Sequence, residues 1–164
     1  MSTPRPPFDY EKKDPGSAYK YAHYEAESPC PELEQVIATS AHWAYKYASC
    51  VLYGRFVAAE PLIAADPHWA YCYATYVIRG RWPEGEAAIA KNQESVLKYI
   101  QLILKKRFPL AEPMLRDDDH LWRSYKKILQ QVDPEGYDEL MLTTGDWVPD
   151  TVAEAALDAA RRSN

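Results

Sequence analysis

The segment "HWAYKYASCVLYGRF" (residues 42–56) is followed 26 residues later by "HWAYCYATYVIRGRW" (residues 68–82). Sliding the whole chain by this period gives five units: 15–40, 41–66, 67–92, 93–118 and 119–144. A fixed period of this length is typical of repeat proteins, in which each copy forms one supersecondary unit. The fold of the chain is therefore predicted from the fold of one unit.

Three columns of the repeat hold in all five units. The seventh position is always tyrosine: Tyr21, Tyr47, Tyr73, Tyr99 and Tyr125. The twentieth is always acidic: Glu34, Glu60, Glu86, Glu112 and Asp138. The twenty-third is always a large aliphatic residue or methionine: Ile37, Ile63, Ile89, Leu115 and Met141. The repeat therefore extends through residues 15–144.

Each unit is predicted to begin with a long helix. The residues that close the units belong to the types that cap helix N-termini: Asp14, Ser40, Asp66, Asn92, Asp118 and Thr144. Apolar residues then follow at positions 4, 7, 8 and 11, which lie on one face of a helix. The helix is predicted to end at position 14, where Gly54 and Gly80 can adopt the left-handed conformation.

A short second helix is predicted from about position 17 to position 24, so that each unit is a helical hairpin. A single hairpin cannot bury its apolar face, but stacked neighbours can. The expected fold is all-α: a short α-solenoid of five 26-residue helix-turn-helix repeats. Residues 1–13 are predicted to be a disordered N-terminal arm, and residues 145–164 to form a C-terminal capping helix.

The pattern "A-Y-x-Y-A…V-I-x-G-R-W-P-E-x-E…I-A-x-D-P" is carried here by residues 70–74, 77–86 and 89, with looser copies in the other units. It resembles tandem repeats in uncharacterised proteins of bacteriophages and some bacteria. The resemblance covers roughly residues 14–144 and implies a helical repeat fold and a phage-associated origin. It implies no catalytic residue and no activity.

Composition excludes several classes of protein. The 164 residues carry a net charge of −5 with a pI near 5.4, which disfavours broad binding to nucleic-acid phosphates. The three cysteines, Cys30, Cys50 and Cys72, lack metal or redox spacing, so we expect reduced thiols in a cytoplasmic protein. No apolar run of about 18 residues occurs, so no membrane span is expected.

The sequence predicts no enzyme, no cofactor and no metal. His42, His68 and His120 share one column, but equivalent positions on packed helices lie about 8–10 Å apart, too far to share a zinc ion bound at about 2 Å. Residues 117–119 ("DDD") could hold Mg²⁺ in a nuclease, although Asp118 is also the expected helix cap. No phosphate loop or nucleophile motif is present.

Tyrosines at the fifth position form a second aromatic column. Positions 5 and 7 lie about 200° apart on a helix, so a buried position 7 leaves position 5 more exposed, unless it packs on the short helices. Helical repeats commonly bind partners, and exposed tyrosines are typical of interfaces. We therefore expect a non-enzymatic protein-binding module acting on a host or virion protein, with a contact surface comprising Tyr19, Tyr45, Tyr71, Trp43, Trp69, His42 and His68.

Basic residues suggest an alternative partner. Residues in units 4 and 5 could form a nucleic-acid patch: Lys105, Lys106, Arg107, Arg123, Lys126 and Lys127. However, Arg55, Arg81 and Arg107 each precede the acidic position 20 by five residues, which favours structural ion pairs in their column. A short array can also self-associate through its ends, so a homo-oligomer remains an alternative.

Overall fold

The computed structural model describes residues 14–25 and 30–145, and within them every regular element is helical. The α-helices are α1 (Pro15–Tyr24), α2 (Pro31–Ile37), α3 (Ala41–Tyr47), α4 (Glu60–Ala65), α5 (Pro67–Tyr73), α6 (Pro83–Ile89), α7 (Val96–Tyr99), α8 (Glu112–Arg116), α9 (Asp119–Val132) and α10 (Pro134–Thr144). The predicted N-terminal arm and the predicted C-terminal helix after Gly145 lie outside the described residues.

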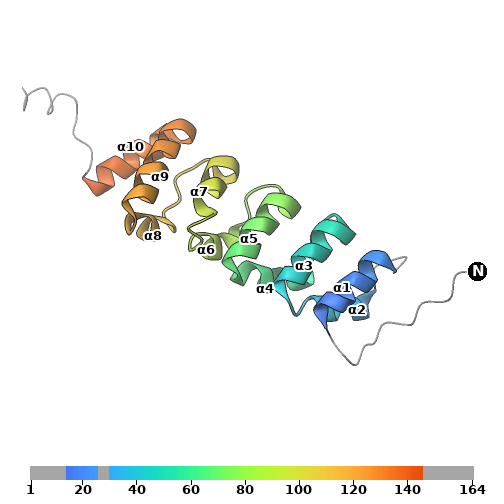
Figure 1. The fold of residues 1–164 in the computed structure, drawn as a ribbon. Helices are drawn as coiled ribbons and strands as arrows, with labels where there is room; N and C mark the ends of the chain where they lie inside the picture. The colour runs from blue at the N-terminus through green and yellow to red at the C-terminus, as the bar shows by residue number, and fades with distance from the viewer. Residues whose placement is uncertain (1–13, 26–29, 146–164) are drawn as a thin grey trace, which may run out of the picture.

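The helices follow one another in a single row, with α1 at one end and α10 at the other (Figure 1). Helices α3, α5 and α7 lie along one edge of the row, and α4, α6 and α8 lie along the opposite edge. Contacts join α1 to α3, α3 to α5, and α7 to α9. The all-helical prediction is confirmed, and neighbours in the sequence are neighbours in space.

Aspartate side chains cap three of the long helices, as predicted. Asp66 accepts hydrogen bonds from the backbone N–H groups of His68 and Trp69, both at 2.9 Å, and Asp14 and Asp118 cap α1 and α9 in the same way. Ser40 makes no such side-chain bond. The prediction for Thr144 was wrong, because it is the last residue of α10 and its hydroxyl donates to the Leu140 carbonyl instead.

The ends of the long helices differ from the prediction. In units 2, 3 and 4 the last turn widens into a π-helix: Ala48–Leu52, Ala74–Ile78 and Ile100–Leu104. The left-handed residue that follows is at position 13: Tyr53 (φ 50°), Arg79 (φ 58°) and Lys105 (φ 50°). Gly54 and Gly80 have no positive φ, so their predicted role was wrong. The left-handed residue that ends each of these helices therefore comes one residue earlier in the unit than predicted.

Units 4 and 5 depart further from the common pattern. Helix α7 begins at Val96, three residues later than predicted. The side chain of Asn92 accepts from the Ser95 N–H at 3.2 Å and donates to the Pro67 carbonyl at 3.0 Å, which stabilises a turn ahead of α7. In unit 5, α9 continues unbroken to Val132, and Asp133 then caps α10.

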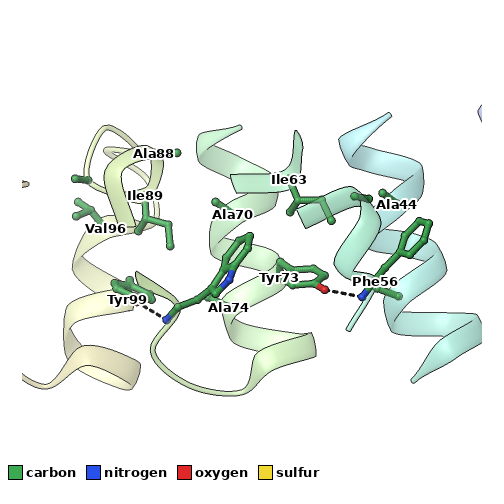
Figure 2. Packing of buried hydrophobic residues seen from close by; sticks show 14 of the residues in the cluster. Ala44, Phe56, Ile63, Ala70, Tyr73, Ala74, Ala88, Ile89, Val96 and Tyr99 are labelled. Atoms are coloured by element: carbon green, nitrogen blue, oxygen red, sulfur yellow. Dashed lines mark hydrogen bonds between the residues drawn. The ribbon is translucent and has the colours of Figure 1, made fainter. Parts of the chain in front are cut away.

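The core is built from the repeated columns. Ala44, Ala48, Ala70 and Ala74 are fully buried, so the long helices approach closely at these small side chains (Figure 2). The predicted core tyrosines at position 7 are 0% exposed from unit 2 onward: Tyr47, Tyr73, Tyr99 and Tyr125. The predicted aliphatic column is buried throughout: Ile37, Ile63, Ile89, Leu115 and Met141.

One unit replaces the phenylalanine of its neighbours with tryptophan. Phe56, Trp82 and Phe108 occupy the same buried position. A Cβ added to Gly85 would lie 2.5 Å from Cε3 of Trp82, whereas the units with phenylalanine carry alanine at the equivalent site. The buried indole Nε1–H of Trp82 has no hydrogen-bond partner among the described residues. Gly85 therefore makes room for the larger ring.

None of the helices in the described ranges is both long enough and apolar enough to span a membrane.

We predict that the Phe–Ala pair of units 2 and 4 can replace the Trp–Gly pair of unit 3. Gly85→Ala alone should lower the free energy of unfolding by about 1–3 kcal/mol, because it overpacks the indole. Adding Trp82→Phe should recover most of this loss, since it removes the clash and the unpartnered N–H. Urea unfolding followed by circular dichroism measures both, with Trp82→Phe alone as control. A double variant no more stable than Gly85→Ala would contradict the prediction.

Candidate functional site

A buried polar contact joins each unit to the next. The Tyr73 hydroxyl, from unit 3, accepts from the Phe56 backbone N–H of unit 2 at 2.7 Å (Figure 2). The same hydroxyl donates to Glu60 Oε1, also in unit 2, at 2.9 Å. Tyr99 and Tyr125 make the same two bonds to their preceding units. At the first junction, the Tyr47 hydroxyl donates to Glu34 at 2.9 Å.

An arginine completes three of these contacts, and we call each set a Tyr–Glu–Arg cluster. Arg55 donates from Nε and Nη2 to the two carboxylate oxygens of Glu60, at 2.7 and 2.6 Å. Arg81 pairs in the same way with Glu86, and Arg107 with Glu112. The prediction that these arginines pair with a carboxylate of their own or the adjacent unit is confirmed, and in units 2, 3 and 4 the carboxylate belongs to the same unit. The positive guanidinium balances the charge of a carboxylate residue that is only about 5–8% exposed.

Burial and the clusters shift the ionisation of their members. The hydrogen bond from Arg55 holds the pKa of Glu60 below its ordinary value, against the opposing effect of burial. Burial raises the pKa of Tyr99 to about 12, and it raises the pKa of Tyr73 and Tyr125 as well. The cluster of Glu60 and Tyr73 therefore holds an ionised carboxylate and a protonated phenol at neutral pH, which is the state that its hydrogen bonds require.

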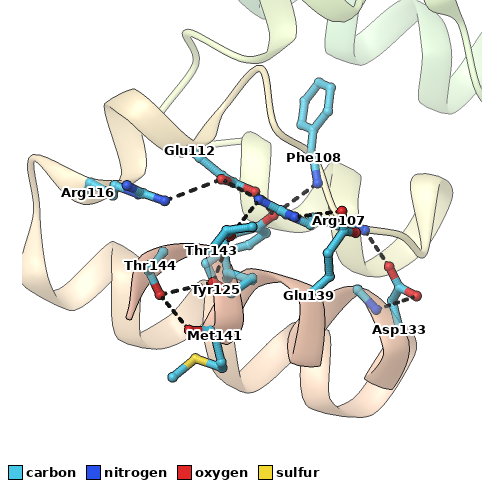
Figure 3. A network of polar contacts seen from close by, with 12 residues as sticks. Arg107, Phe108, Glu112, Arg116, Tyr125, Asp133, Glu139, Met141, Thr143 and Thr144 are labelled. Atoms are coloured by element: carbon cyan, nitrogen blue, oxygen red, sulfur yellow. Dashed lines mark hydrogen bonds and ion pairs between the residues drawn. The ribbon is translucent and has the colours of Figure 1, made fainter. Parts of the chain in front are cut away.

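In the last cluster, Arg107 of the alternative nucleic-acid patch is engaged in ion pairs within the protein. The guanidinium of Arg107 pairs with Glu112 and also with Glu139 at 3.3 Å, and its side chain is only 15% exposed (Figure 3). Lys126 lies over the ring of Trp122, with Nζ 5.9 Å from its centroid. The remaining predicted patch residues are exposed: Lys105, Lys106, Arg123 and Lys127.

The aspartates of residues 117–119 serve the start of α9. Asp118 accepts from the backbone N–H groups of His120 and Leu121, at 2.8 and 2.9 Å. Across residues 14–25 and 30–145, no group of three or more histidine, cysteine, aspartate or glutamate side chains is placed to hold a metal ion.

Most of the predicted partner-binding residues come together in one stack of rings. The ring of Tyr19 stacks on Trp43 of the next unit, with centroids 5.2 Å apart, and Tyr45 stacks on Trp69 at 5.5 Å. His42 lies against both indoles, 4.5 Å from Trp43 and 4.7 Å from Trp69. We call these five residues the ring row.

The remaining predicted residues border the ring row. His68 packs edge-on against Trp69, with centroids 4.6 Å apart. Tyr71 is half-buried, and the next unit carries Ser95 where a tryptophan would meet it. The position-5 rings of units 1 and 2 therefore pack on tryptophans of the next long helix. Burial, with smaller effects from Lys46 and His68, lowers the pKa of His42, which favours the neutral imidazole in the stack.

Three further tyrosines project from the same side and are more exposed than any residue of the ring row. Tyr24, Tyr53 and Tyr76 are 70%, 83% and 58% exposed. Tyr24 and Tyr53 lie close enough to Tyr19 to contribute to its pKa, which burial raises to about 12. Tyr76 lies close enough to Tyr45 to contribute to the pKa of Tyr45, which burial also raises. We call Tyr24, Tyr53 and Tyr76 the exposed tyrosines.

Sequence reasoning did not select the exposed tyrosines as binding residues. Tyr24 and Tyr76 share the tenth position, to the side of the apolar stripe, and could have been found by extending the helical pattern. Tyr53 could not, because it stands at the left-handed residue after a π-turn, which the periodicity does not reveal. Together with the ring row, these side chains form an aromatic surface over units 1 to 3.

The comparisons with known proteins assign no relative. No family model matches the chain, and no match is found among curated proteins or solved structures. The chain is thus described by its own features: an all-helical row of units joined by Tyr–Glu–Arg clusters, with an aromatic surface at one end. Its function has to be argued from those side chains.

We predict that Tyr73→Phe lowers the free energy of unfolding by about 1–3 kcal/mol. The change leaves the Phe56 N–H and one bond of Glu60 without a partner in a buried site. Tyr76→Phe, which removes an exposed hydroxyl three residues away, is the matched control and should change stability by less than about 0.5 kcal/mol. Urea unfolding gives both values, and equal effects would show that the shared hydroxyl is not important for stability.

Low pH should reduce the stabilising effect of the cluster formed by Tyr73, Glu60 and Arg55. The pKa of Glu60 is lowered in the folded state, so its stabilising effect is complete above its ordinary value of 4.5 and is lost as the pH falls through the lower folded-state value. Glu60→Gln should therefore be destabilised at pH 7, and its deficit relative to the unmodified chain should shrink as the pH falls below 4.5, through the lower folded-state pKa of Glu60. Urea unfolding across this range tests it, with exposed Glu84→Gln as control. A deficit that does not change with pH would contradict this account.

Proposed function

We propose that the chain is a short α-solenoid of five helical-hairpin repeats that acts as a non-enzymatic protein-binding module. The contact surface consists of the ring row and the exposed tyrosines, bordered by His68 and Tyr71. The resemblance of the repeat to phage-associated sequences makes a host or virion protein the candidate partner.

The exposure of Tyr24, Tyr53 and Tyr76 is the observation that carries this proposal. Large aromatic side chains at 58–83% exposure lose apolar contact with water when a partner covers them. Tyrosine is enriched among interface residues that dominate binding energy, because its ring buries a large area and its hydroxyl forms a hydrogen bond. Three of them beside one packed aromatic row form such a surface.

The ring row gives this surface a fixed shape. Tyr19 and Tyr45 each stack on an indole of the next unit, so their orientation is set before a partner arrives. A side chain that is already ordered loses less conformational entropy on binding. The half-buried rings therefore form a rigid base, and the exposed tyrosines supply most of the new contact area.

We expect the tyrosines to decide capture of a partner from bacterial lysate. The triple variant Tyr24→Ser/Tyr53→Ser/Tyr76→Ser should reduce recovery of a stoichiometric protein partner by about tenfold or more, since hot-spot side chains each contribute more than about 1 kcal/mol. Affinity capture on the full chain, read by gel and mass spectrometry, measures this loss. Circular dichroism would establish that the variant keeps its fold.

Leu110→Ser/Leu142→Ser is the matched control. These leucines are 61% and 63% exposed, similar to the tyrosines, but they belong to units 4 and 5, away from the aromatic surface. The control should retain the partner. Equal recovery by the unmodified chain and the tyrosine variant would refute the proposed surface.

A further inference from the structure

The outer side of the long helices carries positive charge although the protein is acidic. We call this side, formed by positions 2, 5, 6, 9 and 13 of each unit and opposite the buried stripe, the outer face. At positions 2, 6, 9 and 13, which flank the tyrosine column, six basic residues occur: Lys20, Lys46, Arg79, Lys98, Lys105 and Lys127. Glu94 is the one carboxylate at these positions among the described residues. With a net charge of −5 for the whole chain, this distribution is uneven.

The charges of this face are available to a partner. Lys20, Arg79, Lys98, Lys105 and Lys127 are exposed and Lys46 is half-buried. The ion pairs found in the described residues involve other basic side chains: Arg55, Arg81, Arg107 and Arg116. In units 1 to 3, Glu32 and Glu84 are exposed carboxylates on the short helices α2 and α6. An anionic ligand is therefore attracted to the outer face rather than to the short helices.

The chemistry of the face favours carboxylates over nucleic-acid bases. Single-stranded nucleic acids bind by stacking bases on free aromatic faces. In the ring row, Tyr19 stacks both with His23, at 5.6 Å, and with Trp43. Trp69 stacks with His42 and with Tyr45. These ring faces are used within the protein, so that among the rings named here only Tyr24, Tyr53 and Tyr76 are exposed enough to stack on bases. The ammonium groups of the outer face and the exposed phenol hydroxyls are donors suited to carboxylate oxygens.

The spacing of the units indicates the form of the ligand. Neighbouring packed helices lie about 8–10 Å apart. Lys20 and Lys46 occupy position 6 of consecutive units, whereas Arg79 lies at position 13 of unit 3. An extended polyproline-type chain advances about 9 Å in three residues. Carboxylates three residues apart on such a chain would therefore match the separation expected for Lys20 and Lys46, and the segment would cross unit 3 obliquely to reach Arg79.

We propose, on the basis of the protein-binding function proposed above, that the partner presents an extended acidic segment to the outer face of units 1 to 3. Lys20, Lys46 and Arg79 bind its carboxylates, and the exposed tyrosines cover the intervening residues. The segment carries an acidic residue about every third position and crosses the long helices along the row.

Synthetic peptides test this proposal on the full chain. The probe is a fluorescein-labelled dodecapeptide of four Glu-Ala-Pro triplets, and its binding is followed by fluorescence anisotropy. It should bind about tenfold or more tighter than the same peptide with glutamine in place of glutamate, and its affinity should fall as salt is raised. A peptide of equal composition with its four glutamates in one run should bind more weakly, because its charges do not match the spacing of the units.

Protein variants locate the contact. Lys20→Glu and Lys46→Glu should each weaken binding of the spaced peptide several-fold, and together by about tenfold or more. Lys91→Glu makes the same change of charge at an exposed residue just after α6, outside the positions that form the outer face, and should have a much smaller effect. An equal loss with Lys91→Glu would show a general charge effect and overturn the proposed contact.

Other outcomes decide between ligand classes. Equal binding of the glutamate and glutamine peptides would overturn the proposal, as would tighter binding of a twelve-nucleotide oligo-dT than of the spaced glutamate peptide. Failure of the peptide alongside tyrosine-dependent capture of a protein partner would leave the proposed function standing and remove only the acidic segment. Loss of both would remove the binding surface altogether.

Discussion

A tyrosine hydroxyl shared between a backbone N–H and a carboxylate of the preceding unit is the constraint on which the structure depends. Tyr73 holds the Phe56 N–H and the Glu60 carboxylate at once, so the loop after one long helix is fixed against the middle of the next. Leaving either group unpaired in a buried site would cost more than the bond itself gains. The spacing of the units follows from this contact, which recurs along the row.

The clusters divide each long helix into an inner side that is constant and an outer side that varies. Tyrosine occupies position 7 in every unit, yet position 5 changes from Tyr71 to Leu97 and then Arg123. Because the inner contacts fix the backbone, the outer side chains can differ without loss of the fold. Units 1 to 3 therefore carry an aromatic surface and units 4 and 5 a more basic one on the same scaffold.

Much of this fold could be read from the 26-residue period, because buried side chains recur in fixed columns. The position-7 tyrosines, the Arg–Glu pairs and the aspartate caps were all predicted from their columns. The π-turns, the left-handed Tyr53 and the late start of α7 were not, since a period aligns residues without showing how wide a turn is. The sequence predicts the residues of the ring row but not their stacking, because the contacts with Trp43 and Trp69 depend on how neighbouring units pack together.

Each Tyr–Glu–Arg cluster is completed by two consecutive units and uses nothing more distant in the chain. A gene duplication that copied residues 67–92 in frame would supply its own arginine, glutamate and tyrosine, and so would create a new junction while preserving the old ones. Loss of one such block would rejoin its neighbours through the same three side chains. The length of the protein, and with it the length of the surface that it offers, is therefore open to change by recombination in steps of one unit.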